Sequence, residues 1–166
     1  MQKEKLCSKG FLPDVRSGRC NLMIEEEHVM TLNRSGGRFD LTKIAAAFPE
    51  TADTMLLDTY LTDKPEASIR VFRIYRDVPP HYHTQCDEVL HVLSGEGTFW
   101  IDDPADEAPF APGHLLVFPR RAVHALPRIL RDPVVLLAID TPRRAPDDVV
   151  FINPADGTPS GFIKCL

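Results

Sequence analysis

Short apolar runs separated by polar turn residues dominate the chain from residue 54 onward. Runs of this length that are rich in β-branched and aromatic residues are typical of β-strands. The pattern predicts an all-β fold with eight strands, which suits a jelly-roll barrel. The expected strands are Thr54–Leu61, Ser68–Arg76, Glu88–Leu93, Thr98–Ile101, Leu115–Phe118, Val123–Leu126, Val134–Ile139 and Val149–Ile152.

Turn-forming residues lie between several of these runs, and the 15 prolines of the chain are difficult to place in long helices. No internal repeat is visible, so we expect one barrel rather than two. The expected turns are Asp63-Lys64-Pro65, Ser94-Gly95-Glu96-Gly97, Ala111-Pro112-Gly113 and Arg131-Asp132-Pro133.

One short helix is expected before the barrel, over Leu41–Phe48, where an alanine run follows two candidate capping residues, Asp40 and Thr42. Pro49 would end it. The pattern before residue 38 is irregular and contains glycine-rich breaks. We therefore expect three parts: an N-terminal arm or extension at 1–37, a barrel at 38–152 and a C-terminal tail at 153–166.

Three histidines and one glutamate form the strongest candidate for chemistry. His81 and His83 are two positions apart, so on an extended segment both side chains point to the same face. Glu88 follows at an odd offset and would need a bulge or kink within residues 84–87 to reach that face. His124 would have to come from a separate strand. Together they offer three imidazoles and one carboxylate to a single metal ion, although a His-x-His pair by itself also occurs on solvated strand faces.

Imidazole and carboxylate ligands suit the divalent transition metals Fe, Mn, Co, Ni, Zn and Cu, whereas structural zinc sites more often include thiolates. Four protein ligands do not select one of these metals. An octahedral ion would keep two positions open for water, substrate or oxygen, as Lewis-acid or oxygen chemistry requires.

These residues resemble the two sequence motifs of the cupin superfamily. The first motif is Gly, five residues, His-x-His, three or four residues, Glu, six residues, Gly, and the second is Gly, five residues, Pro-x-Gly, two residues, His, three residues, Asn. The chain departs from the motifs at Tyr75 and Arg121, where each motif would have a glycine, and at Arg128 instead of asparagine. The matching residues are His81, His83, Glu88 and Gly95 in the first motif, and Gly113, Pro119 and His124 in the second.

The resemblance implies a small single-domain cupin, a double-stranded β-helix whose ligands His81, His83, Glu88 and His124 bind a divalent metal. It implies a small-molecule substrate or ligand. A dioxygenase-type metalloenzyme is favoured, with a metal-dependent sugar or sugar-acid isomerase or lyase and a non-catalytic binding protein as alternatives. It also implies a homodimer, in which the N-terminal arm covers the partner's barrel.

The amino-acid composition limits the kinds of partner that the protein is expected to bind. The net charge of −5 and the absence of lysine-rich runs argue against a nucleic-acid surface. The longest apolar stretch, Val134–Ile139, is too short to span a bilayer, so we expect no membrane partner and a cytoplasmic protein. The four cysteines contain no CxxC pair and are interpreted as free thiols.

Several residues near the expected ligands are candidates for lining a pocket. Arg73 and Tyr75 share one strand face and could bind an acidic substrate, although an outward arginine and a half-buried tyrosine are the more ordinary arrangement. The aromatic residues could line an apolar cavity or be simple core. Cys86 could lie near the metal, but a small buried packing residue is more typical. The aromatic candidates are Phe99, Trp100 and Phe118.

Overall fold

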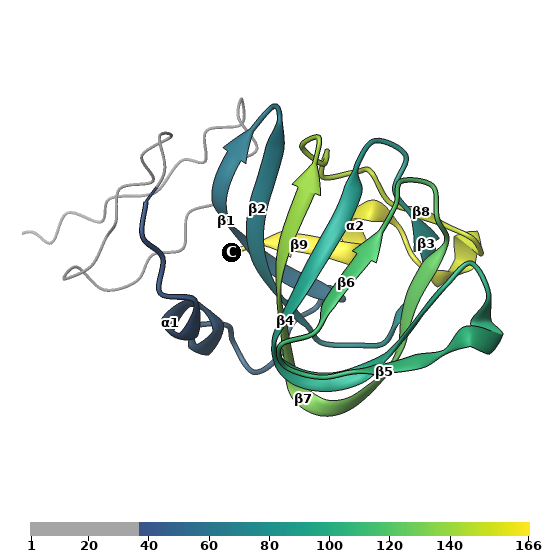
Figure 1. Ribbon diagram of the computed structural model, residues 1–166, viewed down its shortest axis with the longest axis horizontal. Coiled ribbons are helices and arrows are strands. Elements are labelled where there is room, and N and C mark those ends of the chain that lie inside the picture. The colour runs from purple at the N-terminus through teal and green to yellow at the C-terminus, as the bar shows by residue number, and fades with distance from the viewer. Residues whose placement is uncertain (1–36) are drawn as a thin grey trace, which may run out of the picture.

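A computed structural model describes residues 37–166, which fold into a nine-stranded, strongly curved sheet with two short helices (Figure 1). The all-β prediction is confirmed. The strands are β1 Leu56–Lys64, β2 Ala67–Ile74, β3 Val78–Tyr82, β4 Asp87–Ile101, β5 Ala108–Phe110, β6 Leu115–Phe118, β7 His124–Thr141, β8 Val150–Phe151 and β9 Ile163–Cys165. The helices are α1 Leu41–Ala46 and α2 Pro159–Phe162, with single 3₁₀ turns at Pro104–Asp106 and Pro154–Asp156.

Strands β4 and β7 form the centre of the sheet and pair antiparallel along their whole length. On its other edge, each of these two strands pairs with one strand in its first half and with a different strand in its second half. The first half of β4 pairs with β6 and its second half with β5, while β7 pairs first with β3 and then with β2. Two long strands shared in this way bend the sheet around an apolar interior, which is the arrangement of a double-stranded β-helix.

The long central strands correct two of the expected turns. The segments at 94–97 and 131–133 lie within β4 and β7 and face each other, with register shifts of the bulge type at Ser94 and Glu96. Gly95 has a φ of +79°, and a Cβ there would lie 2.6 Å from the carbonyl oxygen of Pro133. Turn-type residues therefore mark a bend in continuous strands rather than a chain reversal.

Helix α1 is confirmed near its expected position. Asp40 is the capping residue, because its side chain accepts a hydrogen bond of 3.1 Å from the backbone N–H of Lys43. The helix ends at Ala46, before Pro49. Leu41 and Ile44 pack over a small apolar cluster on the outside of the sheet, separate from the barrel interior; its buried members are Phe48, Leu57, Leu61, Val71 and Val135.

The C-terminal segment is ordered into the barrel. The second helix, α2, was not expected from the sequence, and β9 pairs parallel with β1, with Leu56 opposite Ile163. Residues 163–165 therefore form one edge of the sheet. The expected arm at 1–37 lies almost entirely outside the described residues, and the domain limits stay predictions. Within the described part of the chain, neither helix has the length and apolarity that crossing a membrane demands.

Candidate metal centre

The three histidines of the two motifs meet inside the barrel. His81 on β3 lies directly opposite His124 on β7, and His83 follows one residue after β3 ends. Tyr82 between them is turned the other way and is partly exposed, as strand alternation predicts. The side chains are almost completely buried, at 2% exposure for His81. Their candidate ligand atoms all lie within 4.8 Å of one another.

Glu88 reaches the same place from the beginning of β4. Its Oε2 atom is 3.6 Å from Nε2 of His83 and 3.6 Å from Nε2 of His124. The expected bulge is in fact a change of strand, because the chain turns between β3 and β4 over residues 83–86. All four predicted residues are therefore brought together.

Backbone carbonyl groups hold all three imidazole rings by the same nitrogen. Nδ1 of His81 is 2.8 Å from the carbonyl oxygen of Pro79, and Nδ1 of His124 is 3.0 Å from that of Ala122. Nδ1 of His83 is bonded in the same way to the carbonyl of Asp148. A carbonyl oxygen only accepts, so each Nδ1 carries a proton, and in the neutral imidazole each Nε2 then has its lone pair free.

The free nitrogens fit a metal ion. Nε2 of His83 and Nε2 of His124 are buried and have no hydrogen-bond partner, since 3.6 Å to Glu88 is too long for a hydrogen bond. Buried polar atoms are rarely left in this state. An ion that binds each atom at about 2.1 Å can bridge atoms up to about 4.2 Å apart, which includes both 3.6 Å separations from Glu88, while the ligand atoms of the three histidines lie within 4.8 Å of one another. The donor set therefore suits one divalent transition metal.

Protonation of the site also favours a cation. Burial lowers the pKa of His81 well below its ordinary value, and the neighbouring His124 and His83 lower it further, so this imidazole is neutral. Burial acts to raise the pKa of Glu88, but the neighbouring His83, His124 and Arg70 outweigh burial and hold that pKa well below the ordinary range. Neutral imidazole and ionised carboxylate are the forms that bind metals.

Arg70, which sequence reasoning missed, fixes the orientation of the Glu88 carboxylate. It is buried on β2, and its Nη2 donates a 3.0 Å hydrogen bond to Oε1 of Glu88. Its Nε donates to Asp140 at 2.8 Å, and its Nη1 is 3.5 Å from Asp58. A charged residue in the otherwise apolar run Ile69–Phe72 was the available signal in the sequence.

Asp148, also missed, holds the turn between the first two histidines and Glu88. Its carboxylate accepts hydrogen bonds from the Thr84 N–H at 2.8 Å, the Thr84 hydroxyl at 2.6 Å and the Gln85 N–H at 2.9 Å. Burial acts to raise the pKa of Asp148, but these bonds outweigh it and lower that pKa. Because the carbonyl of the same residue binds His83, one residue fixes both the turn and the ring.

The cysteines correct one expectation. Cys86 is a free, fully buried thiol, as expected of a packing residue, and burial together with Asp140 and Glu88 raises its pKa to about 12. It is therefore an unreactive thiol. Cys165 is disulfide-bonded, so the interpretation of four free thiols is wrong there. Cys7 and Cys20 lie outside the described residues.

Arg73 and Tyr75 point away from the histidines. Nη1 of Arg73 and the hydroxyl of Tyr75 both donate to the carbonyl oxygen of Pro49, each at 2.8 Å, beside α1. Of the expected aromatic residues, Phe118 does contact the site, because its ring stacks on His124 with a centroid separation of 4.1 Å and an interplanar angle of 8°. Phe99 packs against Phe118 rather than against a histidine.

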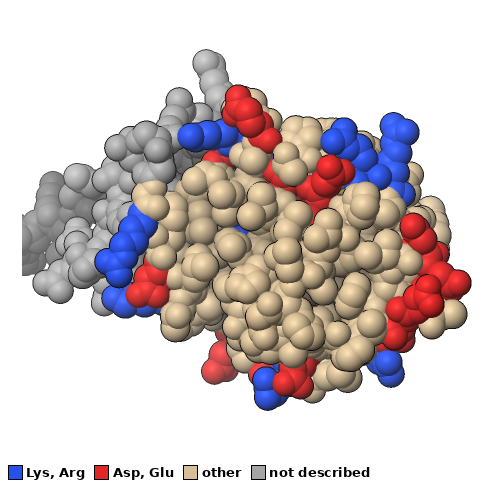
Figure 2. Space-filling model, in the orientation of Figure 1, with Lys and Arg blue, Asp and Glu red and all other residues tan. Residues whose placement is uncertain are grey.

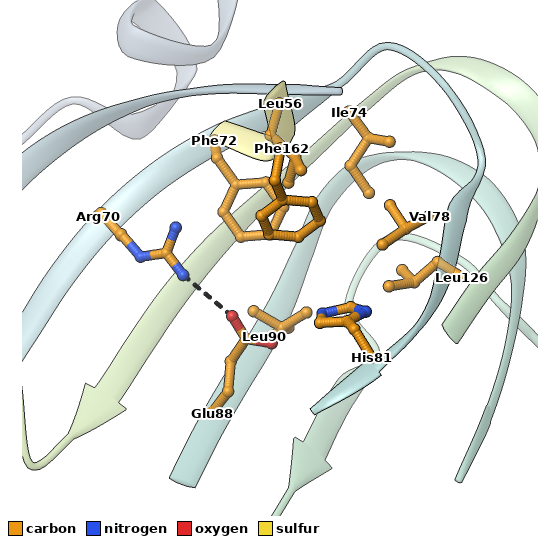
Figure 3. A pocket seen from close by; sticks show the side chains of 10 residues that line it. All are labelled: Leu56, Arg70, Phe72, Ile74, Val78, His81, Glu88, Leu90, Leu126 and Phe162. Atoms are coloured by element: carbon orange, nitrogen blue, oxygen red, sulfur yellow. Dashed lines mark hydrogen bonds and ion pairs between the residues drawn. The ribbon is translucent and has the colours of Figure 1, made fainter. Parts of the chain in front are cut away.

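A narrow pocket adjoins the histidines on the side of β1 and β2 (Figure 3). His81, Glu88 and Arg70 form its polar side, and the remainder is apolar. The apolar lining consists of Leu56, Phe72, Ile74, Val78, Leu90, Leu126 and Phe162. Figure 2 shows that charged side chains of both signs lie mostly around the margin of one face of the molecule, so charge is not concentrated over that part of the barrel.

Comparison with known sequences identifies the central part of the chain. Residues 75–140, which contain all four candidate ligands, match the family model described as a cupin domain. No curated protein matches the chain in sequence.

Solved structures with the same fold are distant in sequence. A Thermus thermophilus protein, TT1209, is 23% identical, with 64% of this chain and 97% of that chain covered and a TM-score of 0.52. A Klebsiella pneumoniae protein with a double-stranded β-helix domain is 13% identical over 63% and 89% of the two chains, with a TM-score of 0.51. Pac13, a nucleoside dehydratase from Streptomyces, is 14% identical over 62% and 82%, with a TM-score of 0.50. These likenesses show the fold.

Proposed function

Because residues 75–140 match the cupin-domain model, we propose that His81, His83, Glu88 and His124 bind one divalent transition metal, on which the protein acts as a small-molecule enzyme. The observation that carries the proposal is the pair of buried Nε2 atoms without a hydrogen-bond partner, on His83 and His124, facing the ionised Glu88. Three Nδ1–carbonyl bonds give the rings the tautomer that a metal needs.

The surroundings of the pocket favour chemistry at the metal over side-chain acid–base catalysis. An isomerase or lyase needs a free base beside the substrate. The polar residues that line the pocket are His81, Glu88 and Arg70. Two of these are proposed ligands, and Arg70 is bonded to carboxylates on β1, β4 and β7. We therefore propose a dioxygenase-type oxidoreductase that uses Fe(II).

Each part of the site has a role in this proposal. A bound ferrous ion would supply a Lewis acid and an electron source for reaction with oxygen. Arg70 keeps Oε1 of Glu88 engaged, so Oε2 would be the oxygen of Glu88 that holds the ion. The apolar lining, with Leu126 and Phe162 near His81, excludes bulk water from the reacting groups.

Metal content of anaerobically purified protein tests this first, by mass spectrometry on the wild type, His83→Ala and a matched control, His91→Ala. His91 lies on β4 like Glu88, but it is partly exposed on the other face of the strand. We expect one iron per chain in the wild type and the control, and its loss in His83→Ala. Oxygen uptake with small acids, phenols, diketones and thiols follows.

Each result separates the alternatives. Iron with substrate-dependent oxygen uptake supports the dioxygenase. Stoichiometric manganese, nickel or zinc without oxygen uptake would overturn it in favour of a metal-dependent isomerase or lyase. Metal binding without turnover of any kind would leave a non-catalytic binding protein, and a metal-free wild type would refute the metal site. Homodimerisation, cytoplasmic location and the absence of nucleic-acid and membrane partners stay predictions.

A further inference from the structure

The pocket beside His81 is closed by one residue from outside the barrel. Nine of its ten lining residues lie on strands β1, β2, β3, β4 and β7, whereas Phe162 lies on α2 near the C-terminal end of the chain. In Figure 3 its ring occupies the space between Leu56 and His81. The ring centroid is 5.1 Å from that of His81 and 5.6 Å from that of Phe151.

The pocket is too small for an organic molecule while Phe162 stays in place. Its volume is about 10 Å³, which is near the lower limit for one water molecule. A substrate that reaches the proposed metal from this side must therefore displace a lining residue. Phe162 is the one lining residue that does not itself lie on a strand.

Few backbone bonds hold the segment that carries Phe162, and Cys165 at the end of this segment is disulfide-bonded. Helix α2 is four residues long and is followed by β9, which pairs with the sheet at β1 over three residues. Two further backbone bonds attach it, from the Met55 N–H to the Gly161 carbonyl at 3.2 Å and from the Leu166 N–H to the Asp58 carbonyl at 2.9 Å. Short pairings at the edge of a sheet are among the first parts of a fold to open.

We propose that Phe162 determines the size and access of the ligand pocket, and that the ligand is a small molecule with an apolar, ring-sized body and an oxygen-donor head. The body would take the place of the Phe162 ring between Leu56 and Phe72, and the head would lie toward Glu88 and His81. This rests on the proposed metal site only for the role of the head. The apolar part stands on the lining itself.

Benzene and benzoate are the probes, and their binding is measured by NMR on metal-free protein and on protein loaded with Co(II) or Zn(II). Phe162→Ala should bind benzene at least about tenfold more tightly than the wild type, because a preformed apolar cavity takes such a ligand without a rearrangement. Phe48→Ala, which empties the outer cluster under α1, is the matched control and should leave the resonances of His81 unchanged.

Hydrogen exchange in the wild type distinguishes a gating role of Phe162 from a purely structural one, because a ligand would not change exchange near a phenylalanine that only fills the core. Benzoate binding should speed hydrogen exchange at the Met55 and Leu166 amides, because displacement of the segment breaks both of their bonds. The Met55 N–H donates to Gly161 within the segment, and the Leu166 N–H, directly after β9, donates to Asp58 on β1. Co(II) but not Zn(II) should broaden the benzoate ring signals. If Phe162→Ala does not fold, Phe162→Leu and the wild-type exchange experiment decide.

The outcomes separate this proposal from the metal proposal. Benzene binding beside His81 in Phe162→Ala, without any metal binding, would support the pocket and overturn the metal site. Metal binding with no gain in benzene affinity, and with unchanged exchange at Met55 and Leu166 on benzoate addition, would overturn the role of Phe162 alone. Benzene that shifts only resonances far from His81 would also overturn it.

Discussion

Arg70 and Glu88 are joined by a 3.0 Å hydrogen bond from Nη2 to Oε1, which leaves Oε2 as the oxygen that faces His83 and His124. The guanidinium is buried and contacts carboxylates on three other strands. Glu88 is thus the one proposed ligand whose position depends on the side chain of another residue.

Removing this partner should weaken metal binding. Arg70→Met is expected to lower metal affinity about 10–100-fold, because groups that orient a ligand typically have effects of this size, and Arg70→Lys should retain part of the affinity. Competition with a chelator measures the metal affinity of each variant. Arg73→Met, on the outer face of the same strand, is the control and should bind as the wild type does. Equal affinity in a folded Arg70→Met protein would contradict the role assigned to Arg70.

Loss of the metal should destabilise the fold, because an ion that binds only the native state stabilises it in proportion to the logarithm of its concentration. At a free metal concentration about 100 times the Kd, the stabilisation is about 2.7 kcal/mol. Thermal unfolding with and without a chelator measures the difference in Tm. His83→Ala should show the same Tm in both conditions, and a chelator-sensitive Tm in that variant would place the metal elsewhere.

Arg121 adopts a backbone conformation that suits glycine, with a φ of +66°. It occupies the position where the second cupin motif has glycine, and its N–H donates to the His83 carbonyl at 2.7 Å. A left-handed conformation costs a residue with a Cβ roughly 1–2 kcal/mol, so Arg121→Gly should raise the free energy of unfolding by about 1 kcal/mol.

Chemical denaturation of Arg121→Gly and of its neighbour variant Arg120→Gly checks this. Arg120 is not among the described residues with positive φ, so glycine there should destabilise the protein, by about 0.5–1 kcal/mol. Equal destabilisation by both substitutions would show that the φ of Arg121 carries no cost.

Arg144 is buried, with 1% of its surface exposed, and its Nε and Nη1 have no hydrogen-bond partner among residues 37–166. Buried donor atoms that lack a hydrogen-bond partner cost about 1–3 kcal/mol each in desolvation. Arg144→Met, of similar length and apolar, should therefore leave Tm unchanged or raise it. A loss of more than about 3 kcal/mol, the usual effect of breaking a buried ion pair, would mean that bound water or a ligand satisfies the guanidinium.

The sequence was sufficient to predict that His81 and His83 point to the same side, because strand alternation is a local rule. It places His81 and His83 on one face whatever the rest of the chain does. The partnership of His81 with His124 depends on which strands pair, and only the resemblance to a known motif pattern supplied that in advance. The role of Arg70 could not be predicted, because its contacts join four strands and a single sequence does not determine the register in which strands pair.

The two misplaced turns and the missed strand β3 share one physical cause. Gly95 and Pro133 look like turn residues, yet across the sheet they fit against each other and bend two continuous strands. Pro79 and Pro80 likewise hide β3, because proline is rare in central strands but is tolerated in a short strand with few ladder bonds. Local composition marks an irregular backbone, whereas the neighbouring strand decides whether the chain turns or bends.

The three carbonyl groups that hold the imidazoles have a consequence for how this protein could change over generations. They belong to the main chain at Pro79, Ala122 and Asp148, so no exchange of a side chain deletes the acceptors. Mutations can therefore accumulate around the rings without loss of the tautomer that the site needs. Glu88 differs, because the side chain of Arg70 holds it and a single substitution can remove that side chain. Descendants of this chain that acquire a different metal preference should therefore carry their substitutions at Glu88 or Arg70.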